Sequence, residues 1–134
     1  MDSSFPGAVP EIPVRDLAAA VAYYQSRLGF TLDWGGGTSD GIAGISKGAC
    51  RLFLTGTGFR EAAGNHAPVV VWLNLDSRAA VDTLHRVWDA AQARIVDPPA
   101  DKPWKLREFT AADPDGNLLR VFYDFGNGGD GDAP

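Results

Sequence analysis

The 134-residue chain has few of the residues on which several classes of protein depend. Its single cysteine, Cys50, excludes an internal disulfide framework. It has only two histidines, His66 and His85, so histidine-rich metal chemistry is not expected. No apolar run approaches the roughly 18 residues that a bilayer-spanning helix needs, and no segment resembles a secretory signal. We therefore expect a soluble, cytoplasmic protein with no membrane partner.

Positive charge is also scarce. Lysine and arginine number 12 against 17 aspartates and glutamates, which gives a net charge of -5. Two of these acids lie in residues 127–134, a glycine-rich stretch that we expect to be a disordered acidic tail, so the rest of the chain is only mildly acidic. Nucleic-acid-binding domains carry a basic patch. We therefore expect no nucleic-acid partner.

The remaining chain contains the same order of strand and helix patterns twice. The first copy has strands at 9–14, 30–34, 42–46 and 51–55, and the second has strands at 69–73, 94–96, 106–111 and 118–123. A helix begins after Asp16 in the first copy and after Asp76 in the second, where an aspartate can cap it, and residues 97–101 read as a loop. We expect an α+β domain over residues 8–126, with βαβββ modules at 8–55 and 69–126 and a linker at 56–68. One module alone buries too little apolar surface, so the two sheets should complete one another.

Short motifs lie in order within this repeat. They are residues 12–17 (IPVRDL), 23–24 (YY), 28–30 (LGF), the run from Trp104 to residues 107–109 (REF), and 113–117 (DPDGN). A DPDG turn alone is common, but the ordered set resembles the glyoxalase, bleomycin-resistance and extradiol-dioxygenase superfamily, also called vicinal oxygen chelate. The resemblance implies an incomplete barrel around a cavity and a homodimer.

In the metal-using members of that superfamily, two histidines and two glutamates typically hold the ion from equivalent strand positions. The resemblance places these positions at Val9, Phe53, Val70 and Arg120. Strand alternation favours Phe53 over Leu52 as the inward residue. None of the four side chains can ligate a divalent cation, and neither histidine occupies a ligand position. We therefore expect no metal and no cofactor, as in the bleomycin-resistance branch, whose cavity binds without metal.

Strand alternation extends the cavity lining from those positions. We expect the ligand to contact Glu11, Arg51, Phe53, Trp72, Asn74, Trp104, Arg120 and Phe122. Some of these residues have other interpretations: Trp72 could belong to the core, Arg120 could pair with Glu11, and Trp104 could cap the cavity or contact a dimer partner. Buried positions are expected for Trp88 and Cys50, and residues 105–108 are expected at a solvated edge.

Three functions remain open. The first is a metal-free binding protein that sequesters an aromatic or amphiphilic compound, for example an antibiotic, in the cavities of a homodimer. The second is a superfamily enzyme, a lyase, isomerase or dioxygenase, with a displaced or absent metal site. The third is a scaffold whose cavity is filled by its own side chains. The net charge favours a cationic ligand, whereas the two arginines of the expected cavity favour an anionic or neutral one.

Overall fold

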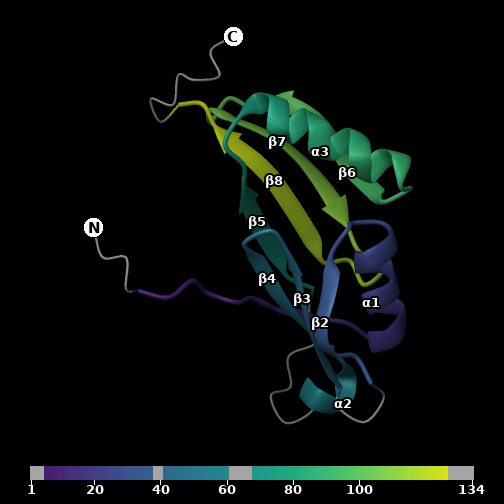
Figure 1. Ribbon diagram of the computed structural model, residues 1–134. Helices are drawn as coiled ribbons and strands as arrows, with labels where there is room; N and C mark the ends of the chain where they lie inside the picture. The colour runs from purple at the N-terminus through teal and green to yellow at the C-terminus, as the bar shows by residue number, and fades with distance from the viewer. Residues whose placement is uncertain (1–4, 38–40, 61–67, 127–134) are drawn as a thin grey trace.

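The computed structural model describes residues 5–37, 41–60 and 68–126, and it forms two similar halves (Figure 1). The first half contains β1 (Glu11–Pro13), α1 (Leu17–Ser26), β2 (Thr31–Gly35), β3 (Ile42–Lys47) and β4 (Cys50–Thr55). A short helix, α2 (Thr57–Arg60), lies in the segment expected to be a linker. The second half contains β5 (Val70–Asn74), α3 (Arg78–Ala90), β6 (Arg94–Asp101), β7 (Leu106–Ala112) and β8 (Leu118–Asp124). The expected acidic tail and His66 lie outside the described residues.

Each half is a mixed four-stranded sheet with the same strand order. The orders are β1-β4-β3-β2 and β5-β8-β7-β6, with β1 parallel to β4 and β5 parallel to β8. The remaining neighbours are antiparallel. The two sheets do not close into a barrel within one chain (Figure 1). The predicted α+β fold of two βαβββ modules is therefore confirmed.

The two long helices begin at side-chain caps. The Asp16 carboxylate accepts a hydrogen bond from the Ala19 amide at 3.1 Å, as the sequence predicts for an N-cap. In the second module the cap is Ser77, whose hydroxyl accepts from the Ala80 amide at 3.0 Å. The prediction of Asp76 was wrong by one residue, because adjacent Asp and Ser are both good caps and the sequence alone does not separate them.

The prediction of a loop at residues 97–101 was also wrong. These residues continue β6, which pairs with β7 through an irregular register between Asp97 and Ala100. Pro98 and Pro99 lie within this irregular stretch, where their missing N–H groups interrupt no ladder. Because β6 is the edge strand of its sheet, it tolerates prolines that an inner strand would exclude.

The core forms where each sheet packs against its helix. Tyr24 of α1, Trp88 of α3 and Phe109 of β7 are almost completely buried, so the prediction for Trp88 is confirmed. The Trp88 indole N–H donates to the Leu28 carbonyl at 3.0 Å, which joins the two modules. Cys50 is only half-buried, and this burial raises the pKa of its thiol. No helix in the described part of the chain is long and apolar enough to cross a lipid bilayer.

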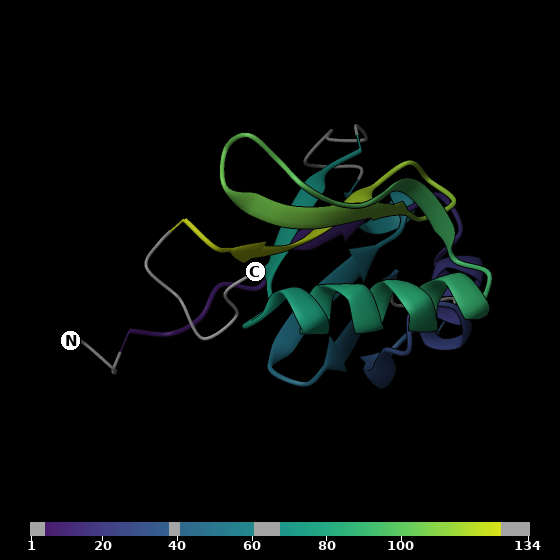
Figure 2. The same cartoon turned by 90° about the horizontal axis from the view of Figure 1, so that it is seen from above.

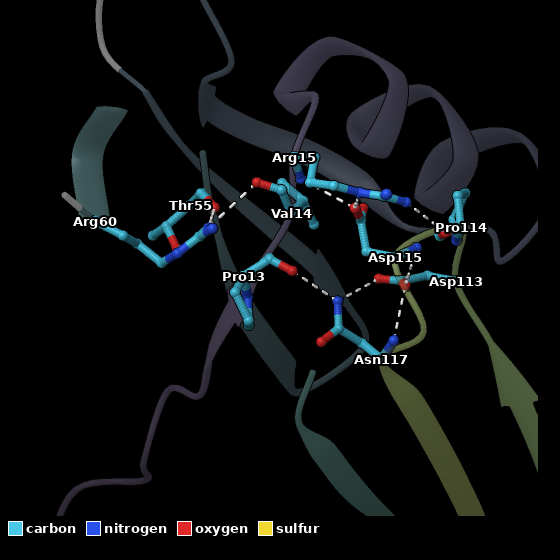
Figure 3. Close-up of polar contacts among 9 residues, drawn as sticks. All are labelled: Pro13, Val14, Arg15, Thr55, Arg60, Asp113, Pro114, Asp115 and Asn117. Carbon is cyan, nitrogen blue, oxygen red and sulfur yellow. Dashed lines mark hydrogen bonds and ion pairs between the residues drawn. The ribbon is translucent and has the colours of Figure 1, made fainter. Parts of the chain in front are cut away.

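The turn between β7 and β8 connects the two modules (Figure 3). Asp113 is fully buried and accepts hydrogen bonds from the amides of Asp115 and Asn117 at 2.8 and 3.0 Å. The Asn117 amide group donates to the Pro13 carbonyl at 2.8 Å, at the end of β1. Arg15 pairs with Asp115 at 2.7 Å. Residues 12–17 and 113–117, two of the motifs that carry the family resemblance, therefore meet at the junction of the modules.

Candidate functional site

Each sheet has one face that carries no described helix. In the second sheet, α3 lies along one face and the opposite face is left open (Figure 2). Along β5, Val71 is buried, whereas its neighbours Val70 and Trp72 are 50% and 47% exposed. We call this surface the C-terminal open face and define it by Trp72, Asn74, Trp104, Glu108, Arg120 and Phe122. Its counterpart on the first sheet, the N-terminal open face, is defined by Glu11, Trp34, Arg51 and Phe53.

A continuous row of contacts crosses the C-terminal open face. Glu108 is fully buried, and its two carboxylate oxygens accept from the Trp104 indole N–H at 2.9 Å and from Arg120 Nη2 at 2.7 Å. The Arg120 guanidinium lies 4.6 Å from the centre of the Trp72 ring. The Trp72 ring packs edge-on against Phe122 with centroids 5.6 Å apart. Four of the predicted ligand residues are therefore in one connected cluster that Glu108 holds together.

Glu108 corrects two predictions from the sequence. Arg120 pairs with Glu108 and not with Glu11, which instead accepts a hydrogen bond from the Thr55 hydroxyl at 3.1 Å. Glu108 is also not part of a solvated edge. It lies opposite Phe122 in the β7–β8 register, so it shares the face of Phe122 and Arg120. Strand alternation puts Glu108 on the face of β7 opposite to that of Phe109. The sequence nevertheless suggested a solvated edge, because the charged residues Lys105 and Arg107 lie close to Glu108.

Arg107, the neighbour of Glu108, lies on the helix side of β7. It pairs with Asp82 of α3 at 2.9 Å and with Asp101 of β6 at 3.1 Å. Partial burial disfavours its charge, but the hydrogen bonds that Arg107 donates to these two carboxylates outweigh burial and raise the Arg107 pKa. Burial alone would raise the pKa of Asp101, whereas the hydrogen bonds that it accepts from Arg107 and Arg78 lower this pKa overall. These pairs fix the strand that carries Glu108 against its helix.

The N-terminal open face contains a tryptophan to which the sequence analysis gave no role. Trp34 of β2 is 42% exposed, and its ring packs against Phe53 with centroids 5.1 Å apart. The Arg51 guanidinium lies over the Phe53 ring, 5.7 Å from the ring centre. A Cβ atom at Gly44 of β3 would overlap the Trp34 ring. A glycine in an otherwise apolar strand was the available signal, because it often marks a close approach.

Three predicted ligand residues also line a groove between the modules. Arg51, Trp72 and Asn74 border a cavity of about 520 Å³ that lies between the β3–β4 turn and the β5 edge. Its other walls are largely apolar, and Lys47 adds a second positive charge. A cleft of about 600 Å³ at the start of α1 contains none of the predicted ligand residues. The groove therefore continues from the Trp72 end of the C-terminal open face.

The four positions at which the family resemblance places metal ligands carry no suitable donors here. Phe53 packs against Trp34, and Arg120 pairs with Glu108. Val9 and Val70 have no ligating atom in their side chains. Among the residues that the structure describes, no three His, Cys, Asp or Glu side chains form a group that could hold a metal ion. His85 lies on α3 with its ring 5.3 Å from Phe109, on the helix-covered side of the sheet.

Comparison with known families agrees with the fold and the motifs. The model of the Glyoxalase/Bleomycin resistance protein/Dioxygenase superfamily matches residues 8–121. The chain belongs to this superfamily. No curated protein sequence gives a significant match to the chain.

Several solved structures are similar to this protein over most of the chain. TioX from Micromonospora sp. ML1 is 26% identical, with a TM-score of 0.74 over 89% of this chain and 99% of TioX. The bleomycin-binding protein from bleomycin-producing Streptomyces verticillus, complexed with copper(II)-bleomycin, is 29% identical, with a TM-score of 0.66 over 90% of this chain and 97% of that protein. A lactoylglutathione lyase from Agrobacterium tumefaciens is 20% identical, covers 88% of this chain and 94% of its own, and has a TM-score of 0.69. At that identity the lyase indicates a shared fold only.

Proposed function

We propose that the chain is a cytoplasmic, metal-free binding protein that sequesters an aromatic or amphiphilic small molecule, an antibiotic being one candidate. The observation that carries this proposal is the row of contacts on the C-terminal open face. Trp72 is 47% exposed beside an arginine that the buried Glu108 holds in place. An exposed aromatic ring next to oriented polar groups suits a flat ligand. The similarity to a protein that binds bleomycin supports the same class of function.

We propose further that two copies of the chain form the complete cavity. In one copy, Trp34, Trp72 and Trp104 are 42%, 47% and 56% exposed on the two open faces. Exposed clusters of large apolar side chains are characteristic of interaction surfaces. In the dimer, the N-terminal open face of one copy would cover the C-terminal open face of its partner. Glu11, Arg51 and Phe53 would then complete the wall around the ligand.

The alternative is an enzyme of the same superfamily. Its support is the carboxylate of Glu108, because a cavity acid can act as a general acid or base. Glu108 is fully buried, however, and both of its oxygens already accept hydrogen bonds from Trp104 and Arg120. This arrangement suits a positioning residue better than a proton donor that must reach a substrate. Binding without turnover is therefore the function that the site favours.

Thermal unfolding with added compounds tests this proposal. We expect a flat aromatic antibiotic to raise the Tm of the full chain. A compound at 100 times its Kd stabilises the folded state by about 2.7 kcal/mol, which is a shift of several degrees for a domain of this size. Trp72→Ala should remove the shift. Val87→Ala is the matched control, because Val87 is 54% exposed on α3, away from both open faces.

Three further outcomes would contradict parts of the proposal. A Tm shift that persists in Trp72→Ala would place binding elsewhere on the molecule. Stoichiometric, tightly bound nickel, zinc, manganese or iron in the purified protein would favour the enzyme alternative. Light scattering should give the mass of two chains, and a monomer at all concentrations would contradict the shared cavity.

A further inference from the structure

Arg120 is held in place by Glu108, but only some of its hydrogen-bond donors have acceptors in the described part of the chain. Arginine has five N–H donors, and Glu108 accepts from the Nη2 atom alone. The Nε atom of Arg120 is closed off from solvent and has no hydrogen-bond partner in the described part of the chain. The side chain as a whole is nevertheless 30% exposed, so part of the guanidinium is open to the C-terminal open face. A buried donor without an acceptor is unfavourable. A ligand cannot reach Nε, but an acceptor on the ligand can bond to the N–H groups on the exposed part of the guanidinium.

Within one copy of the chain, the surroundings of Arg120 disfavour a positively charged ligand. Glu108 is fully buried and both of its oxygens accept hydrogen bonds, so a cationic ligand cannot form a direct ion pair with it. Asp124, a further carboxylate on this side of β8, is four residues away, or about 13 Å at the rise of a strand. The Trp72 ring already carries the Arg120 guanidinium 4.6 Å from its centre. A cationic ligand would therefore share the Trp72 ring with Arg120, and it would offer no acceptor to the Arg120 N–H groups.

The ion pair of Arg120 and Glu108 also weakens the attraction between Arg120 and a negatively charged ligand. The Glu108 carboxylate lies 2.7 Å from Arg120 and neutralises most of its charge. A ligand carboxylate at Arg120 would also lie close to that buried negative charge. A neutral acceptor, such as a carbonyl oxygen, can use the unsatisfied donors without either penalty.

Resting on the proposed function, we infer that the ligand of the C-terminal open face is a neutral, planar aromatic group that presents a hydrogen-bond acceptor to Arg120. The aromatic plane rests on the exposed part of Trp72, and the acceptor points to the open side of the guanidinium. The positive charge of Arg120 is already paired with Glu108 within the protein, so the ligand need not supply a negative charge.

Three probes with one ring system test this inference by isothermal titration calorimetry of the full chain. They are naphthalene-2-carboxamide, naphthalene-2-carboxylate and 2-naphthylmethylammonium, which differ in charge and in the acceptor they offer. We expect the carboxamide to bind with the lowest Kd, about tenfold below that of the ammonium compound, as one hydrogen bond to a charged donor implies. Equal or tighter binding of the ammonium compound, or tightest binding of the carboxylate, would overturn the inference.

Arg120→Lys adds a sharper comparison. Lysine keeps a positive charge near the buried Glu108 but loses the additional donors of the guanidinium. We expect it to raise the carboxamide Kd about tenfold and to leave the ammonium Kd within about twofold. An unchanged carboxamide Kd would overturn the inference. The circular dichroism spectrum reports whether the variant folds, and the probe series on the unchanged chain decides the question if it does not.

The two proposals fail in different ways. If all three probes bind with similar Kd values and all are lost in Trp72→Ala, the inference is wrong and the proposed binding site stands. If none of the probes binds, or if binding is unaffected by Trp72→Ala, both the proposed site and the inference are wrong. Val87→Ala should leave all three Kd values unchanged.

Discussion

Tyr24 places its hydroxyl against the Asp113 carboxylate inside the protein, at 2.9 Å. Burial raises the pKa of Tyr24 well above its ordinary value of 10.0, and the negative charge of Asp113 raises it further. The phenol is therefore held in its protonated form as a donor. This contact fixes α1 to Asp113, the first residue of the DPDGN motif. It also makes the stability of the folded state depend on pH in the alkaline range.

Tyr24→Phe tests this dependence. At neutral pH we expect the variant to lose about 1–3 kcal/mol, because the buried hydrogen bond to Asp113 is gone. The folded-state pKa of Tyr24 is raised, so its contribution is fully present below pH 10.0 and declines as the pH rises above that value. The stability difference between wild type and variant should therefore shrink above pH 10.0. Urea unfolding at a series of pH values measures it, and a constant difference would contradict the assignment.

At the scale of a structural element, residues 113–117 form the turn between β7 and β8 and bond to two other strands. The turn between β7 and β8 bonds to the end of β1 through Asn117 and Pro13, and to the start of β5 through Asn117 and Val69 at 2.9 Å. Asn117 is 1% exposed, so the backbone groups that it satisfies have no access to water as a substitute. The sequence of this turn is common in proteins. In this fold, the turn also connects the two sheets.

Asn117→Ala and Arg15→Ala separate the buried and exposed parts of this connection (Figure 3). We expect Asn117→Ala to destabilise the protein by about 3 kcal/mol, because it leaves buried backbone groups unpaired. Arg15→Ala removes a short ion pair to Asp115, but the Arg15 side chain is 78% exposed, so its effect should be small. Chemical denaturation of both variants gives the comparison. A larger loss from Arg15→Ala would contradict the importance of the buried contacts.

At the scale of the whole molecule, the two modules share one hydrophobic core. Buried side chains of both halves belong to a single cluster, which includes Leu28 of the first module and Trp88 of the second. The Tyr23 hydroxyl donates to the Ala112 carbonyl at 2.8 Å and accepts from the Arg94 amide at 2.9 Å. Residues from both modules therefore depend on one another for their burial and their hydrogen bonds.

This shared core predicts a single unfolding transition. We expect tryptophan fluorescence and far-ultraviolet circular dichroism to report the same midpoint, and the calorimetric and van't Hoff enthalpies to agree. Addition of a ligand should shift that transition as a whole without splitting it. Two separate transitions would show that the modules unfold independently, contrary to the contacts between them.

The C-terminal open face shows which features of the site strand alternation can predict and which it cannot. Strand alternation placed Trp72, Arg120 and Phe122 on the same face of the second sheet, and the structure has them there in one cluster. Alternation does not give the neighbour on the adjacent strand. Arg120 pairs with Glu108 because β7 lies beside β8 in that sheet, whereas Glu11 belongs to the other sheet.

By itself, the sequence determined the repeated order of strands and helices and which residues of a strand share a face. These properties depend on residue type and on short-range periodicity, which are written along the chain. Only the tertiary structure decided that Glu108 is buried as the partner of Arg120, that Trp34 lies over Gly44, and that the DPDGN turn joins the modules. Those contacts depend on strand register and on sheet packing, which bring together residues that are distant in the sequence.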